Sequence, residues 1–300
     1  MKSSYFPSEG VWLKGCIHSH STVSDGVFPP EELAARYAAQ GYDFLSMTDH
    51  NVLVSHRKLP GLLTLTGLEH DIEYSPDKCT HVVGLTPAGR EATTYPCRRY
   101  SALELTDQDL VNLMVRDGQF VSLAHPVWSR MEPHEILALK GFHAIEVFNN
   151  GTEHLCHGGA AEFLWDLLLR HGRRVFATAV DDVHVPCDLF GGWVWVKARE
   201  RSEAAILQAL FDGAFYPSSG PVIRDLWLDG DTVGINCSPC REIHFVTYPP
   251  RGKSHFAPEG QCLTEATHTL TGRETYVRAV CVDREGRSAW SNPIFLDHRP

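Results

Sequence analysis

The first two thirds of the chain alternate short apolar runs with segments of helical period. The apolar runs predict strands at residues 11–17, 44–47, 62–67, 81–85, 120–123, 144–147, 175–180 and 193–196. The segments of helical period predict helices at about residues 30–40, 106–116, 160–171 and 202–211. Strands that alternate with helices in this way are typical of an α/β fold.

Several of these helices carry end signals of their own. Pro30 suits a first helical turn, and Gly41 suits the position just after a helix. Thr106 with Asp109 predicts a capping box, in which each side chain binds the backbone of the other. The helix near residues 160–171 is predicted to bury one face, made of Phe163, Leu164, Leu167, Leu168 and His171.

After residue 218 the pattern changes to short alternating runs separated by turn clusters. These runs predict strands at residues 223–228, 232–236, 243–247, 275–282 and 289–295. No helical period occurs among them, so this part is predicted to be a small β-sandwich. The expected division is therefore an α/β part over residues 1–218 and a β-sandwich domain over residues 219–300.

Composition narrows the classes of partner. The net charge of −10 argues against a basic surface for long double-stranded nucleic acid. It leaves nucleotides open, because bound divalent cations would reverse the local charge. The first residues lack an apolar segment, and no run of 18 apolar residues occurs, which predicts a cytoplasmic protein that does not enter a membrane.

Nine cysteines and 17 histidines are the residue counts that bear on chemistry. The cysteines are scattered; Cys16 and Cys281 lie in apolar runs and are predicted to be buried thiols. Cys237 and Cys240 have the spacing of a redox or zinc pair, but no second pair follows, so no function is predicted for them. The histidine count is the one anomaly of the composition.

The densest chemistry lies between residues 14 and 51. His18 and His20 are two residues apart, so in an extended chain both imidazoles point the same way. Asp25 follows in a Ser-Asp-Gly turn, and His50 closes the next apolar run. A strand, helix and parallel strand bring such residues to one end of a sheet, where α/β folds place their active sites.

Later strands add more donors of the same kind, and the full candidate set has nine members. They are His18, His20, Asp25, His50, Glu69, His81, His125, Asp182 and His184. Mixed imidazole and carboxylate donors suit Zn, Mn or Fe, and nine donors are enough for two or three divalent ions. Asp181 competes with Asp182 for the last carboxylate, and only the Asp-x-His spacing favours Asp182.

Taken together, these motifs resemble the PHP (polymerase and histidinol phosphatase) family. The matching stretches are His18-Ser19-His20, Ser24-Asp25-Gly26, Thr48-Asp49-His50-Asn51, Gly67-Leu68-Glu69, the run at His81, Ala124-His125-Pro126 and Asp182-Val183-His184. The resemblance implies a distorted (β/α)7 TIM-like barrel with a trinuclear metal site. It also implies three ligand groups: His18, His20, Glu69 and Asp182; Glu69, His81 and His125; Asp25, His50 and His184. The C-terminal part is similar to two-domain PHP proteins that carry a β-sandwich.

The expected function is a metal-dependent phosphoesterase. It would hydrolyse a small phosphorylated substrate, such as a phosphomonoester, a nucleotide or an oligonucleotide end, by a metal-activated hydroxide. A metallohydrolase of a neutral carbamate, ester or amide is the alternative, and a non-catalytic binding protein is a third class. Basic groups at the mouth would favour a phosphate, and an apolar mouth a neutral substrate.

No catalytic side chain is predicted beyond the metal-activated water. The candidates for orienting a ligand or contacting substrate are Asp49, His70 and Arg130, followed by His56, Arg57 and the Arg98-Arg99 pair. For Asp49 a turn-stabilising role is equally compatible with the sequence, and the Arg98-Arg99 pair is predicted to be solvated. The histidines at positions 134, 143, 154, 157 and 171 are predicted to be ordinary surface or packing residues.

Overall fold

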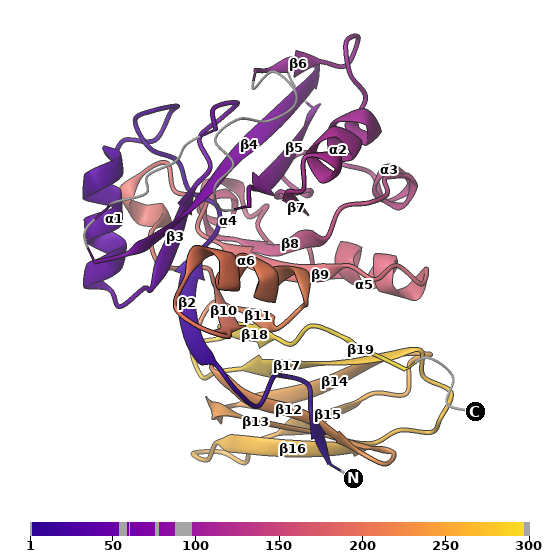
Figure 1. Cartoon of the computed structure of the whole chain (residues 1–300). Coiled ribbons are helices and arrows are strands. Elements are labelled where there is room, and N and C mark those ends of the chain that lie inside the picture. The colour runs from indigo at the N-terminus through magenta and orange to yellow at the C-terminus, as the bar shows by residue number, and fades with distance from the viewer. Residues whose placement is uncertain (1, 54–58, 60, 76–77, 88–97, 297–300) are drawn as a thin grey trace.

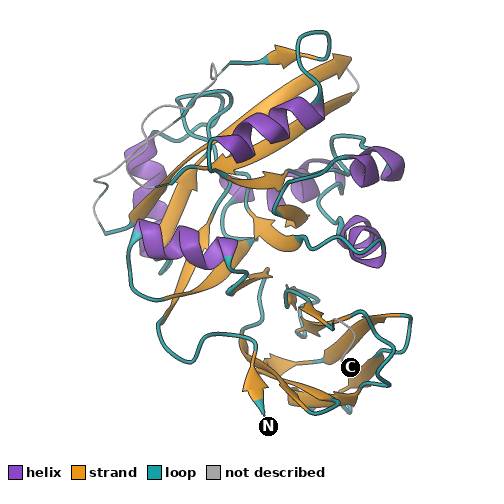
Figure 2. Cartoon of the chain, turned by 45° about the vertical axis from the view of Figure 1, so that its right-hand side comes forward, coloured by secondary structure: helices purple, strands orange, loops and turns teal. Residues whose placement is uncertain are grey.

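A computed structural model describes residues 2–53, 59, 61–75, 78–87 and 98–296 of the 300-residue chain. The chain forms one large mixed sheet, with helices confined to its first part, and a smaller sheet that packs on its other end (Figures 1 and 2). Among the described residues, no helix combines the length and the apolar character that crossing a membrane requires.

Nine strands of the large sheet come from the first part of the chain, and a two-residue strand, β6, flanks them. The bounds are β2 Val11–Cys16, β3 Phe44–Met47, β4 Leu63–Ser75, β5 Lys78–Leu85, β6 Tyr100–Ser101, β7 Phe120–Leu123, β8 Ala144–Asn149, β9 Phe176–Val180, β10 Trp193–Ala198 and β11 Phe215–Ser218. The runs β2–β3–β4 and β7–β8–β9 are parallel. Strand β5 runs antiparallel between them, and β10 runs antiparallel to β2.

All four predicted helices are present, and two short ones accompany them. The bounds are α1 Pro30–Ala39, α2 Asp107–Arg116, α3 Pro133–Ala138, α4 Asn150–Cys156, α5 Glu162–Arg170 and α6 Glu203–Phe211, with a 3-10 turn η1 at Pro186–Asp188. Thr106 and Asp109 form the predicted capping box of α2. The sequence therefore located the helix ends well.

The buried face of α5 differs from the prediction. Its buried residues are Leu164, Trp165, Leu168 and Leu169, whereas Phe163 is 65% exposed. The indole Nε1 of Trp165 donates a hydrogen bond to the carbonyl of Val175 at 2.9 Å. Because that bond satisfies the one polar atom of the ring, the helix can bury the larger tryptophan and leave the phenylalanine outside.

The expected closed (β/α)7 barrel is not confirmed. Within the described ranges, no ladder joins β9 to β2, because β2 already pairs with β3 on one edge and β10 on the other. The sheet still curls back on itself: Ser19, after β2, forms a parallel bridge with Val183, after β9. This bridge brings together the ends of strands that lie far apart in the ladder.

The C-terminal part is a β-sandwich, as predicted. Strands β1 Ser3–Ser4, β12 Ile223–Asp229, β13 Thr232–Cys240 and β16 Leu263–Thr269 form the small sheet. Strands β14 Glu242–Tyr248, β15 Lys253–Phe256, β17 Tyr276–Val282, β18 Ser288–Trp290 and β19 Ile294–Phe295 belong to the large sheet. The single strand predicted at residues 289–295 therefore corresponds to parts of two strands, β18 and β19. Strands β15 and β16 were not predicted.

Two strand pairings, among other contacts, tie the sandwich to the first part. Strand β1, at the start of the chain, pairs with β12, so these residues lie on the sandwich and not in the α/β part to which the division at residue 218 assigns them. Strand β11 pairs with β18 at Ser218 and Ala289, which carries the large sheet from one part into the other. The sandwich core includes Ile235, Phe245 and Ala279, drawn from both sheets.

Candidate metal centre

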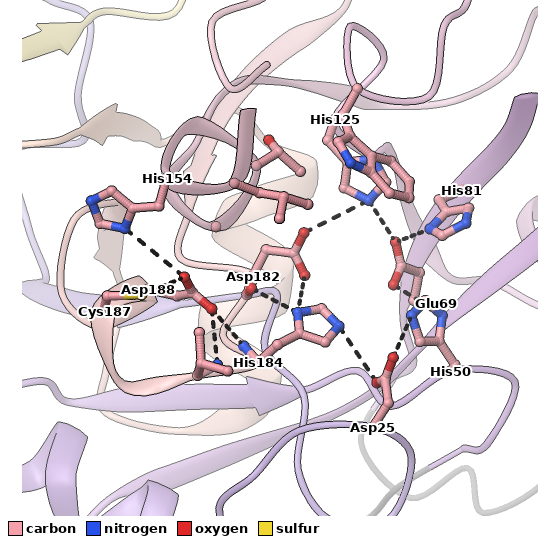
Figure 3. Close-up of a pocket in the computed structure, with 15 residues that line it drawn as sticks. Asp25, His50, Glu69, His81, His125, His154, Asp182, His184, Cys187 and Asp188 are labelled. Carbon is pink, nitrogen blue, oxygen red and sulfur yellow. Dashed lines mark hydrogen bonds and ion pairs between the residues drawn. The ribbon is translucent and has the colours of Figure 1, made fainter. Parts of the chain in front are cut away.

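The nine predicted donors converge on one end of the curled sheet, and Figure 3 shows seven of them around a cavity. His18 and His20 follow β2, His50 follows β3, His125 follows β7, and Asp182 and His184 follow β9. Glu69 was predicted just past the end of its strand. It lies within β4 instead, because the pairing with β5 extends β4 to Ser75.

Four buried donors point at one another most closely. The Nε2 atoms of His18 and His20 lie 3.2 Å apart, and each lies 3.1–3.2 Å from Glu69 Oε2 and Asp182 Oδ1. Four ligands at about 2.05 Å from a zinc ion would be separated by about 3.3 Å. Neither carboxylate oxygen has a hydrogen-bond partner in the described structure. This donor set therefore fits a divalent cation, and it is the group that the family resemblance implies.

Glu69 also faces three further imidazoles. Its Oε1 lies 3.0 Å from His81 Nδ1 and 3.1 Å from His125 Nε2, and its Oε2 lies 3.3 Å from His50 Nδ1. Of these four residues, His50, Glu69 and His81 form a group whose donor atoms all lie within 4.8 Å of one another, and His125 is not part of that group. Both carboxylate oxygens of Glu69 thus face imidazole nitrogens.

A third set surrounds the half-exposed carboxylate of Asp25. His184 Nε2 lies 3.4 Å away, His20 Nδ1 3.6 Å away and His50 Nε2 3.7 Å away. The family pattern has Asp25, His50 and His184 here, and the structure adds His20, whose two ring nitrogens face two different groups. Gly26 allows this turn, because a Cβ there would lie 2.4 Å from the carbonyl oxygen of His20.

The sequence analysis missed Glu146, a buried residue of β8. Its Oε1 accepts a hydrogen bond from His18 Nδ1 at 2.7 Å, and its Oε2 accepts from the backbone N–H of His125 at 2.8 Å. Asn149 Nδ2 donates to both Glu146 Oε2 and Asp182 Oδ2, at 2.9 and 3.0 Å. A proton held on Nδ1 leaves His18 Nε2 as a lone-pair donor. The signal was available, since Glu146 is the one charged residue of an apolar run.

Mutual electrostatics hold the carboxylates ionised. Burial alone would raise the pKa of Glu69, but the surrounding imidazoles, His18 foremost, keep it well below its usual value. Burial would likewise lower the pKa of His20, yet Asp182 and Glu69 outweigh it and raise this pKa to about 9. The carboxylates of Glu69 and Asp182 are therefore ionised near neutral pH, as metal ligands must be.

Two of the donors sit on an unusual backbone. His125 has a φ of 22° and Asp182 a φ of 51°, in the left-handed region that non-glycine residues seldom adopt. Such strain persists where surrounding contacts impose it, and it gathers at functional sites. Here it turns both side chains toward Glu69.

The structure also shows the surroundings of the other polar residues that the sequence offered as ligands or as partners of ligands. Asp181 points away from the cluster and accepts hydrogen bonds from Tyr37 and from the backbone of residues 190–192. Asp49 accepts from the backbone and hydroxyl groups of Ser21 and Ser24, so it holds the turn that carries Asp25. The buried His70 lies with its Nδ1 3.2 Å from Asn51 Oδ1, and neither cavity at the cluster is lined by it.

Two cavities meet over the cluster and share His50, His81, Trp128 and Leu155 among their walls. The first, of about 480 Å³, is completed by Thr152, His154, Val185 and Cys187. The second, of about 640 Å³, is lined by Lys78, Arg99 and Arg130 together with Asp71 and Glu73. His154 was predicted to be an ordinary histidine, but it lies in the cavity wall because α4 begins directly after β8.

The Arg98-Arg99 pair was predicted to be solvated, but its two residues have different surroundings. Arg98 pairs with Glu104 on the surface, whereas Arg99 forms an ion pair with the buried Asp71 and lines the second cavity. Of the described cations there, Arg130 is exposed and has no described ion-pair partner. His56 and Arg57 lie outside the described residues.

No family model matches this chain. It is 36% identical over 75 residues to a 5′-3′ exoribonuclease of Haemophilus influenzae, a match that spans 23% of this chain and about a quarter (27%) of that relative.

Among solved structures, the fold is similar to a two-domain protein from Bacteroides vulgatus that contains a predicted PHP-like metal-dependent phosphoesterase. The TM-score is 0.51 at 17% identity, over 94% of both chains. An amidohydrolase from Chromobacterium violaceum, solved with sulfate and no metal, matches 57% of this chain and 88% of its own length at 18% identity and a TM-score of 0.44. The chain thus shares the two-part fold of a PHP-like protein, as the sequence motifs indicated.

Proposed function

We propose that this protein is a metal-dependent phosphoesterase that hydrolyses a small phosphorylated substrate. The observation that carries the proposal is the four-donor set of His18, His20, Glu69 and Asp182, whose spacing matches the edges of a metal coordination shell. Because Glu69 also faces His50, His81 and His125, we expect a second ion beside the first, and Asp25 with His184 extends the set toward a third.

The roles of the residues follow from these contacts. Bound Zn, Mn or Fe ions would supply Lewis acidity at a phosphoryl oxygen and lower the pKa of water to produce a nucleophile near neutral pH. Glu146 keeps the proton of His18 on Nδ1, and Ser129 Oγ lies 3.1 Å from His125 Nδ1, so both rings direct Nε2 to the cluster.

The second cavity supports phosphate as the group that is bound. Its cations Lys78, Arg99 and Arg130 stand beside the donor cluster. Lys78 is paired with Glu135, and Arg99 with Asp71 and Glu73, so these two are held in place by carboxylates. The exposed Arg130 is therefore the side chain best placed to form a bidentate contact with a phosphate. The short match to an exoribonuclease favours nucleotides and oligonucleotide ends as first substrates to test.

A second candidate function, hydrolysis of a neutral carbamate, ester or amide, is favoured by the first cavity. Trp128, Leu155 and Val185 give it an apolar wall beside the same donors. Leu155 is 70% exposed, so apolar surface is offered to a ligand at the mouth. A neutral substrate would use this wall and would not need Arg130.

The test is metal analysis joined to a substrate screen. The purified protein is stripped with a chelator, reloaded with Zn, Mn or Fe(II), and assayed on nucleoside monophosphates, short 5′-phosphorylated oligonucleotides, phosphodiesters and aryl carbamates. We expect two or three bound ions per chain and metal-dependent release of phosphate or nucleotide.

Glu265→Gln serves as the matched control for Glu69→Gln, because Glu265 is an exposed carboxylate on the sandwich. The control should keep wild-type activity and metal content. Fewer than two ions in the wild-type protein, or turnover of carbamates with none of phosphate esters, would reject the phosphoesterase proposal.

A further inference from the structure

A second cluster of metal-type donors lies in the core of the β-sandwich, remote in sequence from the nine-donor centre. The thiols of Cys237, Cys240 and Cys281 are free and fully buried, and their sulfur atoms all lie within 4.8 Å of one another. Cys237 and Cys240 come from β13 of the small sheet, and Cys281 from β17 of the large sheet. The thiol cluster thus joins the two layers of the sandwich.

The backbone is adapted to bring the first two thiols together. In a regular strand, residues three apart point to opposite faces. Here the pairing of β13 with β16 changes register between Asn236 and Cys240, so both thiols turn inward while Pro239 is exposed. Ser238 fixes the irregular stretch, since it donates its N–H to Val222 and accepts the N–H of Val222 on its hydroxyl.

The surroundings of the three thiols also suit a metal bound by thiolates. The guanidinium of Arg224 donates to the carbonyl of Cys237, which brings a positive charge to the edge of the cluster. No carboxylate or imidazole joins the thiols as a described donor group, so the donor set is soft throughout.

We propose that Cys237, Cys240 and Cys281 form a second metal site, which binds one thiophilic divalent cation of the zinc class and clamps the two sheets of the sandwich. Each thiol releases its proton to solvent as its sulfur binds the cation, and nothing is oxidised or reduced. Three thiolates and a divalent cation leave one net negative charge, which the nearby Arg224 offsets. A disulfide would need an added oxidant and would leave one thiol unused, whereas coordination uses all three.

Cadmium is the probe, because its NMR shift separates sulfur ligands from nitrogen and oxygen ligands. The full-length protein, reduced and stripped of metal, is titrated with ¹¹³Cd²⁺. We expect one resonance in the three-sulfur range beside those of the nine-donor centre, and a sulfur-to-cadmium absorption band that saturates at one equivalent. The wild-type spectrum alone can reject the proposal, whatever the stability of any variant.

Variants assign the resonance. Cys240→Ser should abolish it and leave the nitrogen and oxygen resonances and the hydrolase activity unchanged, whereas Cys262→Ser, an exposed thiol of the same domain, should change nothing. Cys281→Ala removes a thiol of the other sheet and should also abolish the resonance. Absence of a three-sulfur resonance in reduced wild-type protein would overturn the proposal and leave the thiols as core packing. So would a resonance that survives both removals, or mass spectrometry that finds a disulfide between two of the three thiols in protein purified under reducing conditions.

Discussion

Two buried glutamates, one in each part of the molecule, show how differently the same side chain can be used. Glu274 in the sandwich is 2% exposed, and both its oxygens accept hydrogen bonds from Thr271 or the backbone of Arg273. Glu69 is fully buried, yet its Oε2 has no hydrogen-bond partner in the described structure and lies 3.1–3.3 Å from nitrogens of His18, His20 and His50. The sandwich carboxylate is satisfied by the protein, and the Glu69 carboxylate is arranged for a ligand.

This difference distinguishes a buried carboxylate that stabilises the fold from one that is placed to bind a ligand, and it can be recognised before the substrate is known. A buried polar atom without a partner costs about 1–3 kcal/mol or more when charged, so a fold keeps it only where something else compensates. Around Glu69 a divalent cation would compensate, because it turns a cluster of acceptors into ligands.

The largest effect is expected from Glu69→Gln. The amide keeps the shape of the side chain but removes the charge that faces His18, His20 and His50. Loss of a residue that only hydrogen-bonds to a metal ligand lowers activity about 10–100-fold. Because Glu69 is proposed to be a ligand itself, activity should fall by more than that, and metal content should fall with it. The measurements are kcat with saturating metal and metal per chain by elemental analysis. Wild-type metal content and rate in this variant would show that Glu69 is no ligand.

Glu146→Gln should have the next largest effect. The glutamine has one acceptor oxygen where the carboxylate has two, so it can keep the bond from His18 Nδ1 or the bond from the backbone N–H of His125, but not both. It also lacks the charge that makes His18 a stronger donor. We expect a loss of about 10–100-fold in metal affinity or in kcat. Competition with a chelator of known affinity measures the first, and steady-state kinetics the second. An unaltered affinity together with an unaltered rate would reduce Glu146 to a packing residue.

Arg130→Ala distinguishes the two candidate substrate classes. If the substrate carries a phosphate in the second cavity, kcat/KM should fall by about 10-fold, mainly through KM, because one charge-assisted contact is lost. Leu155→Ala, on the apolar wall, is the matched comparison and should affect phosphate substrates less. The reverse order of effects on the best substrate would favour the neutral-ester hydrolase.

Glu274→Gln is the counterpart of the first substitution. Its amide nitrogen would meet a backbone N–H of Thr271 or Arg273 where a carboxylate oxygen now accepts. We expect the free energy of unfolding to fall by about 1–3 kcal/mol while kcat per folded molecule and metal content stay at wild-type values. Urea titration and the standard assay measure both. A loss of activity without a loss of stability would mean that the sandwich takes part in the reaction.

The sequence predicted the parts of this molecule that depend on local pattern. Six of the nine candidate donors follow strands that the apolar runs located, and Thr106 with Asp109 marked the start of α2, because alternation and caps are short-range signals. The sequence could not predict that β10 occupies the free edge of β2, which is a pairing between distant residues. Strands β15 and β16 were missed because most of their side chains are exposed and leave no apolar alternation.

The same limit applied to the sites. Arg99 lines the second cavity because it pairs with Asp71, which is distant from it in the sequence. Cys281 completes the thiol cluster from the opposite sheet of the sandwich, and it is likewise distant from Cys237 and Cys240 in the sequence. Glu146 was visible as a charge inside an apolar strand, but its meaning depended on facing His18. Sequence spacing thus identified the donors that follow strands and not the residues that orient them.

The smallest effect is expected at His143, a partly buried imidazole of the α/β part outside the donor cluster. Burial lowers its pKa, and its Nδ1 accepts the backbone N–H of Val121 at 3.0 Å, so the folded state holds the ring neutral. A folded-state pKa below the unfolded value means that unfolding takes up a proton, so this stability is present above about pH 6.5 and declines as the pH falls below it. The unfolding free energy of wild-type protein should therefore drop more steeply than that of His143→Gln between about pH 7.5 and about pH 5.5. His134→Gln, at an exposed position, should follow the wild type. Parallel curves for the wild type and His143→Gln would contradict the assignment, because the cluster histidines, common to both proteins, would then account for the whole pH dependence.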